Sequence, residues 1–415
     1  MGTLKAFKYR LYPTKEQQRL LDRQLEECRW LWNTLLAERK SAWEERQESV
    51  DYYAQKAELP DLKAADHPAL REVHSQVLQD VVLRLKKAFD AFSRRMKAGE
   101  EPGYPRFRGR GRYDSLTFPQ VPVGCTLDAA DKRVVVSKIG RIKVLLHRPL
   151  EGRPKTATIR RTATGKWFVS IACEWEPTPL PPAGREVGID VGLKVFAMPS
   201  TGKEIANPHF FRTEEHALAK AQRKHQRALD THNATRAAVT VRVKQAHPDL
   251  DAWQVWQLVS QDPEEHTAWR ERQRRRRVVA RTHERIRWRR DNFTHQESRR
   301  LVNQFDFLAV EDLSVRNLVA NHQLAKSIHD AAWTQFADLV HTKAVWAGRA
   351  YVAVIPAYTS QTCSGCGWRN TALTLADRTF RCANPDRLDC GLVLDRDRNA
   401  ALNIVALGRQ CLASA

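Results

Sequence analysis

The sequence predicts a multidomain α+β protein, in which a small β-barrel with an inserted helical bundle precedes an α/β domain holding a short metal-binding loop. The chain has 415 residues, enough for about two to four hydrophobic cores. Short β-branched runs separated by turns alternate with long stretches of helical periodicity. Four of the eight cysteines cluster between residues 363 and 390, and the other four are scattered. This cysteine usage is typical of a reducing compartment.

The first part of the sequence is predicted to form the barrel and the inserted bundle. The opening segment LKAFKYRLYP looks like a strand, and Thr14 with Gln17 then predicts a capping box for a long helix. Helical periodicity returns in SQVLQDVVLRLKKAFDAFSRRMK, and the β-branched runs RVVVS, IKVLL, ATIRR and WFVSIACEW follow. We therefore expect a barrel at 1–12 and 103–178 and a helical bundle at 13–102.

A proline-rich linker at 176–184 predicts a domain boundary. After it, REVGIDVGLKVFAMPSTGKEIA predicts three strands joined by tight turns, and helical periodicity extends from about 210 to 300. The stretch 229–268 is less basic and is interpreted as an insertion of undisclosed role. Two further strands, in QFDFLAVEDLSV and RAYVAVIPAYTS, precede the cysteines.

The charge of the chain predicts a polyanionic partner. There are 69 Lys and Arg against 48 Asp and Glu, a formal net charge of +21, which favours nucleic acid or an anionic membrane surface. No run of about 18 apolar residues occurs, and MGTLKAFKYRLYP lacks a signal-peptide core. We therefore expect nucleic acid, no membrane, and a cytoplasmic location.

One predicted helix concentrates this charge. In WRERQRRRRVVARTHERIRWRRD, arginines recur along one face at helical spacing, namely Arg270, Arg274, Arg277, Arg281 and Arg285. A charge run of this kind is often only a solvated helix face. Here nearly all charges are positive, and a phosphate backbone is the natural counter-charge.

Three acidic residues predict a metal site separate from the metal-binding loop. Asp190 interrupts the apolar strand of GIDVGLK, Glu311 ends the apolar strand of FLAVEDL, and Asp397 opens a helix in DRDRNAALNI. Acids borne by two strands and a helix in this order are what a ribonuclease H-like α/β fold uses to hold two Mg²⁺ ions. The alternative interpretation is three unrelated salt-bridged or capping acids, and Asp395 or Asp397 could each cap the helix.

The clustered cysteines predict a structural zinc site. Cys363 and Cys366 form a CxxC knuckle, and Cys382 and Cys390 form a second, wider pair in CANPDRLDC. Four thiolates in two pairs can enclose one tetrahedral Zn²⁺. Redox chemistry and isolated free thiols are the alternatives. The wide spacing requires the loop from Asn384 to Asp386 to bulge without moving the ligands.

Taken together, GIDVGLK, FLAVEDL, CSGCG with FRCANPDRLDCG, and DRDRNAALNI resemble the TnpB proteins of bacterial insertion sequences. The resemblance extends through nearly the whole chain, including KAFKYRLYPTKEQQRLL and GYPRFRGRGRYDSLTF. It assigns Asp190, Glu311 and Asp397 to the catalytic centre of a RuvC-type nuclease. Asp395 becomes a supporting or capping acid. The sequence departs from the family pattern in three places: the wide second knuckle, Leu394 where the family often has a His, and the insertion at 229–268.

The resemblance also implies domains and an activity. It implies a wedge-like barrel, a recognition bundle, a RuvC-like nuclease domain at 183–358 and 394–412, and a zinc-binding domain at 359–393. The implied function is RNA-guided endonuclease: a guide RNA from the transposon end directs Mg²⁺-dependent cleavage of double-stranded DNA beside a short target-adjacent motif. The protein would act as a monomer with its RNA in the bacterial cytoplasm, at the nucleoid.

Other functions remain open from the sequence. A non-cleaving RNA-guided DNA-binding repressor on the same scaffold is the main alternative, although such a protein could lose the acid triad that is intact here. A zinc-ribbon DNA-binding protein without RNA and a transposase that joins its own ends are further alternatives.

Overall fold

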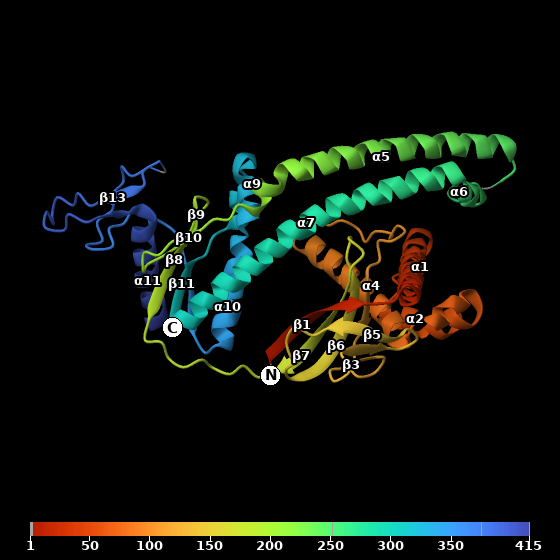
Figure 1. Cartoon of the computed structure of the whole chain (residues 1–415), viewed down its shortest axis with the longest axis horizontal. Coiled ribbons are helices and arrows are strands. Elements are labelled where there is room, and N and C mark those ends of the chain that lie inside the picture. Colours follow the sequence, from red (N-terminus) through yellow and green to blue (C-terminus); the bar gives the residue numbers. More distant parts are fainter. Residues whose placement is uncertain (1–2, 251, 375, 415) are drawn as a thin grey trace. The chain divides into compact units, whose positions relative to one another are not determined.

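The computed structural model describes residues 3–250, 252–374 and 376–414. The chain forms two structural units, Met1–Glu176 and Pro177–Ala415 (Figure 1). The boundary falls at the start of the proline-rich stretch. Among these described residues, none of the helices combines the length and apolarity needed to cross a membrane.

The first unit is built on a seven-stranded antiparallel sheet in the order β2-β6-β7-β1-β5-β4-β3. Its strands are β1 (Thr3–Tyr12), β2 (Ser115–Phe118), β3 (Cys125–Asp128), β4 (Arg133–Val136), β5 (Gly140–Leu145), β6 (Arg153–Arg161) and β7 (Trp167–Trp175). The pairings among described residues leave β2 and β3 as edges, so the sheet is a near-barrel rather than a closed one. The predicted pairing of the N-terminal strand inside this sheet is confirmed, because β1 pairs with both β5 and β7.

One face of this sheet supplies the core of the unit. Phe7, Tyr9 and Leu11 of β1 are buried at alternate positions, as expected when successive strand residues face opposite sides. Buried β7 residues such as Val169 and Ile171 pack in the same cluster, together with residues of the helices. Sheet and helices therefore share a single hydrophobic core.

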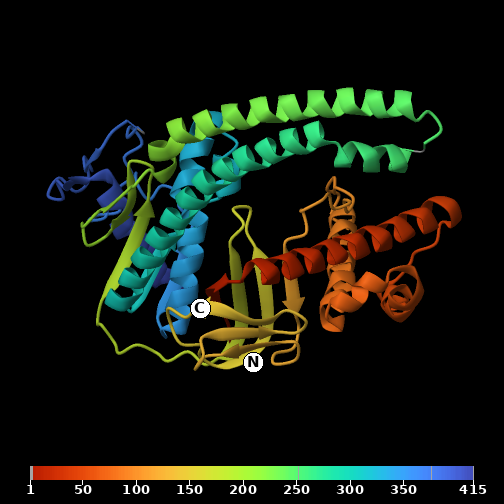
Figure 2. The same ribbon diagram turned by 45° about the vertical axis from the view of Figure 1, so that its right-hand side comes forward.

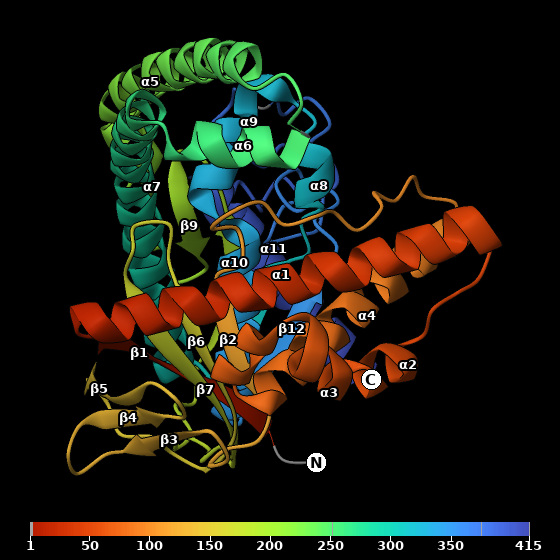
Figure 3. The ribbon, with the colours of Figure 1, turned by 90° about the vertical axis from the view of Figure 1, so that its right-hand side faces the viewer.

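The helices of this unit lie between β1 and β2 in the chain. They are α1 (Lys15–Arg46), α2 (Tyr52–Ala57), α3 (Leu59–Asp61) and α4 (Ser75–Lys97), with a π turn at Leu62–Asp66 and a 3-10 turn at Pro68–Glu72. The predicted capping box at the start of α1 is confirmed, since Thr14 and Gln17 bond reciprocally at 3.2 and 3.0 Å. Gln17 also donates to the Arg141 carbonyl of β5. The long α1 therefore runs across the sheet of its own unit (Figure 3).

The second unit contains a five-stranded mixed sheet in the order β10-β9-β8-β11-β12. Its strands are β8 (Glu186–Val191), β9 (Val195–Pro199), β10 (Ile205–Ala206), β11 (Phe307–Glu311) and β12 (Ala350–Val354). Strand β11 is parallel to both of its neighbours, β8 and β12, whereas β9 is antiparallel to β8 and to β10. The carboxyl ends of β8, β11 and β12 therefore meet at one edge.

The helices of this unit are α5 (Phe210–Ala246), α6 (Ala252–Gln261), α7 (Pro263–Gln304), α8 (Val315–Leu318), α9 (His322–Ala331), α10 (Trp333–Trp346) and α11 (Arg396–Ala413). Three of them, α7, α10 and α11, pack on the two faces of the sheet. Residues of α7 and α10, including Leu301 and Phe336, form a core with Leu308 and Val310 of β11. On the opposite face, Ile404 and Val405 of α11 pack on Phe307 and Ala309. A two-stranded ribbon of β13 (Thr379–Arg381) and β14 (Val393–Asp395) precedes α11.

Two glycines let α11 lie very close to the sheet. A Cβ on Gly188 of β8 would lie 2.0 Å from the Ala401 carbonyl oxygen and 2.6 Å from the Val405 nitrogen. A Cβ on Gly408 would lie 2.6 Å from the Cβ of Ala309. Only a residue without a side chain fits at these contacts. Gly188, two residues before Asp190, therefore sets the approach of the helix that carries Asp397.

The stretch 229–268, predicted as an insertion, forms the distal part of a long helical hairpin. Helices α5 and α7 run side by side, and α6 lies at the turn between them (Figure 2). Val239, Val255 and Val259 are buried together there. His232 and Glu265, both buried, bond across the hairpin at 3.1 Å. The stretch thus has a small core of its own.

Candidate active site

Asp190 and Glu311 lie side by side at the carboxyl ends of parallel strands. The register pairs Gly188 with Ala309 and Ile189 with Val310. Asp190 and Glu311 are the residues that follow these pairs on the two neighbouring strands. Because strand residues alternate between faces, Asp190 shares the face of Gly188 and Glu311 that of Ala309. Both therefore face the side covered by α11, and their carboxyl groups lie close enough for each to shift the pKa of the other.

Helix α11 brings the third acid to the same place. Its N-cap is Asp395, whose carboxylate accepts hydrogen bonds from the backbone N–H groups of Asp397 and Arg398, each at 3.0 Å. Asp397 lies in the first turn, outside the cap, and its charge acts on both Asp190 and Glu311. The structure thus brings together the three acids singled out in the sequence, and it assigns the capping role to Asp395.

The environment of the cluster raises the pKa of two of its acids, Asp190 and Glu311. Burial, followed by the charges of Glu311 and Asp397, holds the pKa of Asp190 well above its usual range. Burial, with a further contribution from Asp397, raises the pKa of Glu311 to about 7. Carboxylates gathered in a poorly solvated place are costly when all are ionised. The cluster therefore requires protons or cations.

Arg396 supplies part of that positive charge. Its Nε and Nη2 atoms donate to Asp397 Oδ1 at 3.1 and 3.0 Å, and its side chain is 14% exposed. The same guanidinium opposes the rise in the pKa of Asp190. One guanidinium offsets one carboxylate, so the site carries an excess of negative charge when all three acids are ionised.

The donor set fits a hard divalent cation. Three carboxylates offer the oxygen ligands that Mg²⁺ prefers. In the described part of the chain, the four cysteines are the one group of potential ligands that gather within 4.8 Å, so the acids are spread more widely. Thr359 adds a hydroxyl that donates to Glu311 Oε1 at 3.2 Å. The site thus has the charge and donors for metal binding, with a more open arrangement than the cysteines.

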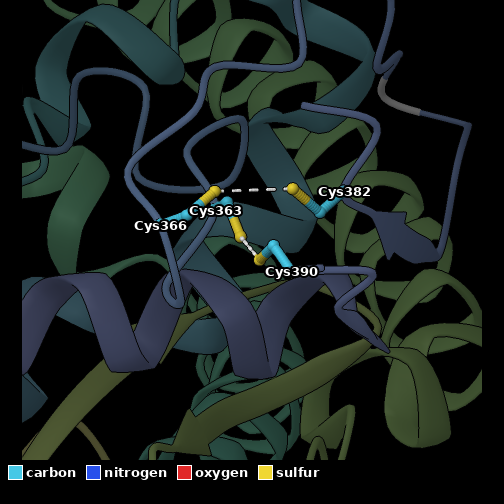
Figure 4. A group of neighbouring side chains, drawn as sticks. All are labelled: Cys363, Cys366, Cys382 and Cys390. Carbon is cyan, nitrogen blue, oxygen red and sulfur yellow. Dashed lines mark hydrogen bonds between the residues drawn. The ribbon is translucent and has the colours of Figure 1, made fainter. Parts of the chain in front are cut away.

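The four clustered cysteines converge on one point (Figure 4). The Sγ atoms of Cys363 and Cys390 lie 3.7 Å apart, and those of Cys366 and Cys382 lie 3.5 Å apart. These separations are far longer than a disulfide bond of about 2.05 Å. A zinc ion about 2.3 Å from four sulfurs in a tetrahedron would separate them by about 3.8 Å. The cysteines therefore fit a tetrahedral metal ion.

The surrounding backbone is shaped for this cluster. Gly367 N–H donates to the Cys363 carbonyl at 2.9 Å, which closes the first knuckle, and Cys382 N–H donates to Leu392 at 2.8 Å. In the wide second pair, Asp386 N–H donates to the Asn384 side chain at 3.0 Å, so the extra residues form a turn that bulges outward. Leu388 at its tip is 87% exposed. The extra residues do not displace Cys390.

Comparison with protein families places the chain among transposon-encoded proteins. A family model described as "Probable transposase" matches residues 170–322, and one described as "Cas12f1-like, TNB domain" matches residues 333–404. A model described as "Helix-turn-helix domain" matches residues 1–48, where the structure forms β1 and α1. The match to residues 333–404 spans the cysteine cluster and Asp397.

Two curated relatives cover almost the entire chain. A protein of Streptomyces pristinaespiralis, named "Putative RNA-guided DNA endonuclease", is 35% identical over 97% of this chain and 89% of its own length. The chain belongs to the TnpB family. Escherichia coli (strain K12) has a relative named "Putative RNA-guided DNA endonuclease InsQ", which is 28% identical over 100% of this TnpB chain and 94% of its own length.

Solved structures of Cas12 proteins are more distant from this TnpB protein. A Cas12f1-sgRNA-target DNA complex aligns over 97% of this chain and 99% of its own, at 14% identity and a TM-score of 0.33. The mini-RNA-guided endonuclease CRISPR-Cas_phi3 aligns over 98% and 92%, at 10% identity and a TM-score of 0.45. These TM-scores are too low to establish a common fold.

Part of the basic face of α7 pairs with Glu214, an acid that was not recognised from the sequence. Arg281 is exposed on α7. Arg285 and Arg289 instead pair at 3.1 Å with Glu214, a buried residue of α5. The partner lies about 70 positions upstream, and only the hairpin brings it near. Two arginines of the predicted phosphate-binding face therefore already have acidic partners, Arg285 with Glu214 and Arg274 with Glu271.

Three further polar residues of this TnpB chain were missed by the sequence interpretation. Thr359 is buried beside Glu311, and Asn399 and Asn403 bond to the loop that leads to Cys363. The amides lie four residues apart on α11, so they share one helix face. In the sequence, the signal for Asn399 and Asn403 is their four-residue spacing beside the DRD motif. Their hydrogen-bond partners become evident only in the fold.

Proposed function

We propose that this TnpB protein is an RNA-guided DNA endonuclease of an insertion sequence, which uses a transposon-derived guide RNA to cut double-stranded DNA beside a short target-adjacent motif. The observation that carries the proposal is the meeting of Asp190, Glu311 and Asp397 on one face of the sheet, at its carboxyl edge. The names of the two curated relatives support the same activity.

We assign the catalytic domain to a RuvC-type, ribonuclease H-like fold at 183–358 and 394–412. The strand order β10-β9-β8-β11-β12 supports this assignment, because β8, β11 and β12 run parallel and β9 is antiparallel to β8. So does the position of α11, which packs on β8 and β11 and carries one of the acids. We assign the barrel to 1–12 and 103–178, the bundle to 13–102 and the zinc-binding domain to 359–393.

The chemistry follows from the acids. Two Mg²⁺ ions bound there would activate a water and stabilise the leaving oxygen of a phosphodiester. Asp190, Glu311 and Asp397 are the residues that would hold the ions. Asp395 fixes the first turn of α11 and hence the position of Asp397, and Thr359 orients Glu311. Asp190 is partly buried, and its reduced solvation strengthens its electrostatic interactions.

For the cysteine cluster, one structural Zn²⁺ held by Cys363, Cys366, Cys382 and Cys390 is the proposed occupant. The four-sulfur donor set and the spacing near that of a zinc tetrahedron support this choice over harder cations. The ribbon of this region has only three residues in each strand. Zinc would stabilise it.

Nucleic acids are the proposed partners. The net charge of +21 provides the counter-charge for a guide RNA and a DNA target. Base pairing with the guide supplies sequence specificity, and the protein recognises backbone shape and a few flanking base pairs. A monomer bound to one guide RNA is the proposed assembly.

The test uses full-length protein purified with its co-expressed transposon end. Sequencing of the bound RNA is expected to yield one defined species whose variable end directs cleavage of a matched plasmid in Mg²⁺. Asp190→Ala and Glu311→Ala are expected to keep the RNA and bind the plasmid without cutting. Guide-directed binding without cleavage by the parent protein would favour a non-cleaving repressor, and absence of a defined RNA would contradict the proposal.

A further inference from the structure

A short segment physically joins the acid cluster to the cysteine cluster. We call residues 359–364 the linking segment. At its start, the buried Thr359 donates to Glu311 Oε1 at 3.2 Å. Near its end lies Cys363, the first sulfur of the second cluster. Only three residues separate them, so a displacement of one end moves the other.

Helix α11 holds the linking segment through two amide side chains. Asn403 Nδ2 donates to the carbonyl oxygens of Thr359 at 2.8 Å and of Thr362 at 2.6 Å. Asn399 Nδ2 donates to the Thr362 carbonyl at 2.7 Å, and Asn399 Oδ1 accepts from Ser364 N–H at 2.9 Å. Asn399 is fully buried. Loss of one partner would leave a buried polar group unpaired, which is unfavourable.

The same helix carries Asp397. Asn399 lies two residues after that acid, and Asn403 lies one helical turn further on. Glu311, the linking segment, the cysteine cluster and Asp397 therefore belong to one hydrogen-bonded unit. No apolar packing alone would specify this arrangement, because each bond here requires a polar atom at a defined place.

We propose that the linking segment couples the two clusters, so that an ordered cysteine cluster raises the affinity of the acids for a divalent cation. Thr359, Asn399 and Asn403 act as positioning residues: Thr359 orients Glu311, and the amides hold the segment against the helix of Asp397. The proposal rests on the proposed function in that the acids hold the cation. By linkage, cation binding at the acids stabilises the cysteine cluster in return.

The experiment measures cation binding rather than cutting. Full-length protein without RNA is kept soluble in high salt, and Mn²⁺ binding is followed by electron paramagnetic resonance. Asp190→Ala serves as the blank that identifies ions held by the acids. The variants are Thr359→Val, which keeps the shape and removes the hydroxyl, Thr359→Ser, which restores it, and Asn403→Leu. Gln410→Leu, an exposed amide of the same helix, is the matched control.

Thr359→Val and Asn403→Leu are expected to weaken Mn²⁺ binding about tenfold or more, as typical for residues that orient metal ligands. Both should keep their bound zinc. Thr359→Ser and Gln410→Leu should bind Mn²⁺ as the parent does. Cys366→Ser should weaken Mn²⁺ binding too, and its effect should not add to that of Asn403→Leu, because both act through one segment.

Parent-like Mn²⁺ affinity in both Thr359→Val and Asn403→Leu would overturn the coupling, whatever the cleavage assay gives. So would full additivity of Cys366→Ser and Asn403→Leu. A parent protein that binds Mn²⁺ at the acids and fails to cut a guided target would instead contradict the proposed function and leave the coupling measurable.

Discussion

The carboxylate of Asp395 accepts a hydrogen bond from the backbone N–H of Asp397 at 3.0 Å. The first acid of the DRD motif therefore caps α11, and the carboxylate of the second is directed to Arg396 and the acid cluster. Two acids that are equivalent as helix-start signals in the sequence hold different positions in the structure. This relationship separates the effects of their substitution.

Asp397→Asn is expected to abolish guided DNA cleavage while leaving RNA loading and target binding nearly intact, because it removes a charge from the metal site. Asp395→Asn should keep most activity, since Asn is itself a good N-cap, and a lost cap costs only about 1 kcal/mol. Cleavage and binding assays on the same preparations check both. Near-parent cutting by Asp397→Asn would move the third ligand elsewhere, with Asp395 the first candidate.

Removal of one cluster cysteine should release the metal. Cys363→Ser is expected to lose about one zinc per chain and to destabilise the region 359–393, because a closed tetrahedral site loses a ligand. Cys28→Ser, in the core of the first unit, should keep its zinc. Metal analysis of protein purified without chelator provides the measurement. An absence of zinc from the parent protein would contradict the assignment.

A methyl group at Gly188 should displace α11. In Gly188→Ala the new Cβ would lie 2.0 Å from the Ala401 carbonyl oxygen, and overpacking of this kind destabilises by about 1–3 kcal/mol or more. Cleavage should fall with it, because the shift separates Asp397 from Asp190. Gly103→Ala, where nothing lies within 4 Å of the added Cβ, is the control for denaturation. Equal stability of the two variants would disprove the close approach.

The effect of Mg²⁺ on stability should depend on pH. The folded protein raises the pKa of Glu311 from 4.5 to about 7, so it retains a proton that the unfolded chain releases. The stability from this protonated state is fully present below pH 4.5 and is lost as pH rises toward about 7. Added Mg²⁺ replaces the proton, and its increase of the melting temperature should be larger at about pH 8 than at about pH 6.

That dependence should disappear when the acids are neutralised. The double variant Asp190→Asn with Glu311→Gln has no carboxylates to titrate at these positions, and Mg²⁺ should then change its melting temperature little at either pH. A parent protein equally stabilised by Mg²⁺ at both pH values would contradict the raised pKa of Glu311 in the acid cluster.

RNA affinity should fall steeply with salt, with each phosphate contact contributing about 0.7 to the slope of log affinity against log salt. Arg281→Ala should reduce the slope by about that amount if α7 contacts RNA. Arg285→Ala should reduce it less, because Glu214 already neutralises that side chain. Filter binding across salt concentrations measures both slopes. Identical slopes for parent and Arg281→Ala would exclude Arg281 from the interface.

Local patterns in the sequence predicted most of the elements. The alternation in β1 and β7, the capping box of Thr14 and the apolar strand ends at Asp190 and Glu311 are each encoded within about ten residues. The acid cluster and the cysteine cluster were predictable because residue type alone limits their chemistry. The capping role of Asp395, in contrast, needed the backbone geometry.

What the sequence could not supply depends on contacts between distant segments. Thr359 meets Glu311 across 48 positions, and Asn403 meets Thr359 across 44. Glu214 meets Arg285 across 71. A threonine, an asparagine and a glutamate are ordinary residues whose roles come from these partners. The edges of the near-barrel were equally hidden, since no local signal states which strands remain unpaired.

The position of α11 has a consequence for synthesis on the ribosome. Strands β1 to β7 all precede the linker, so the first unit can fold while later residues are still being translated. The second sheet cannot complete one face until α11 emerges, because Phe307 and Ala309 pack on Ile404 and Val405. Asp190 and Glu311 are made long before Asp397 joins them. A nascent chain therefore holds an incomplete acid cluster until late in translation, and the cleavage proposed for this cluster must await that helix.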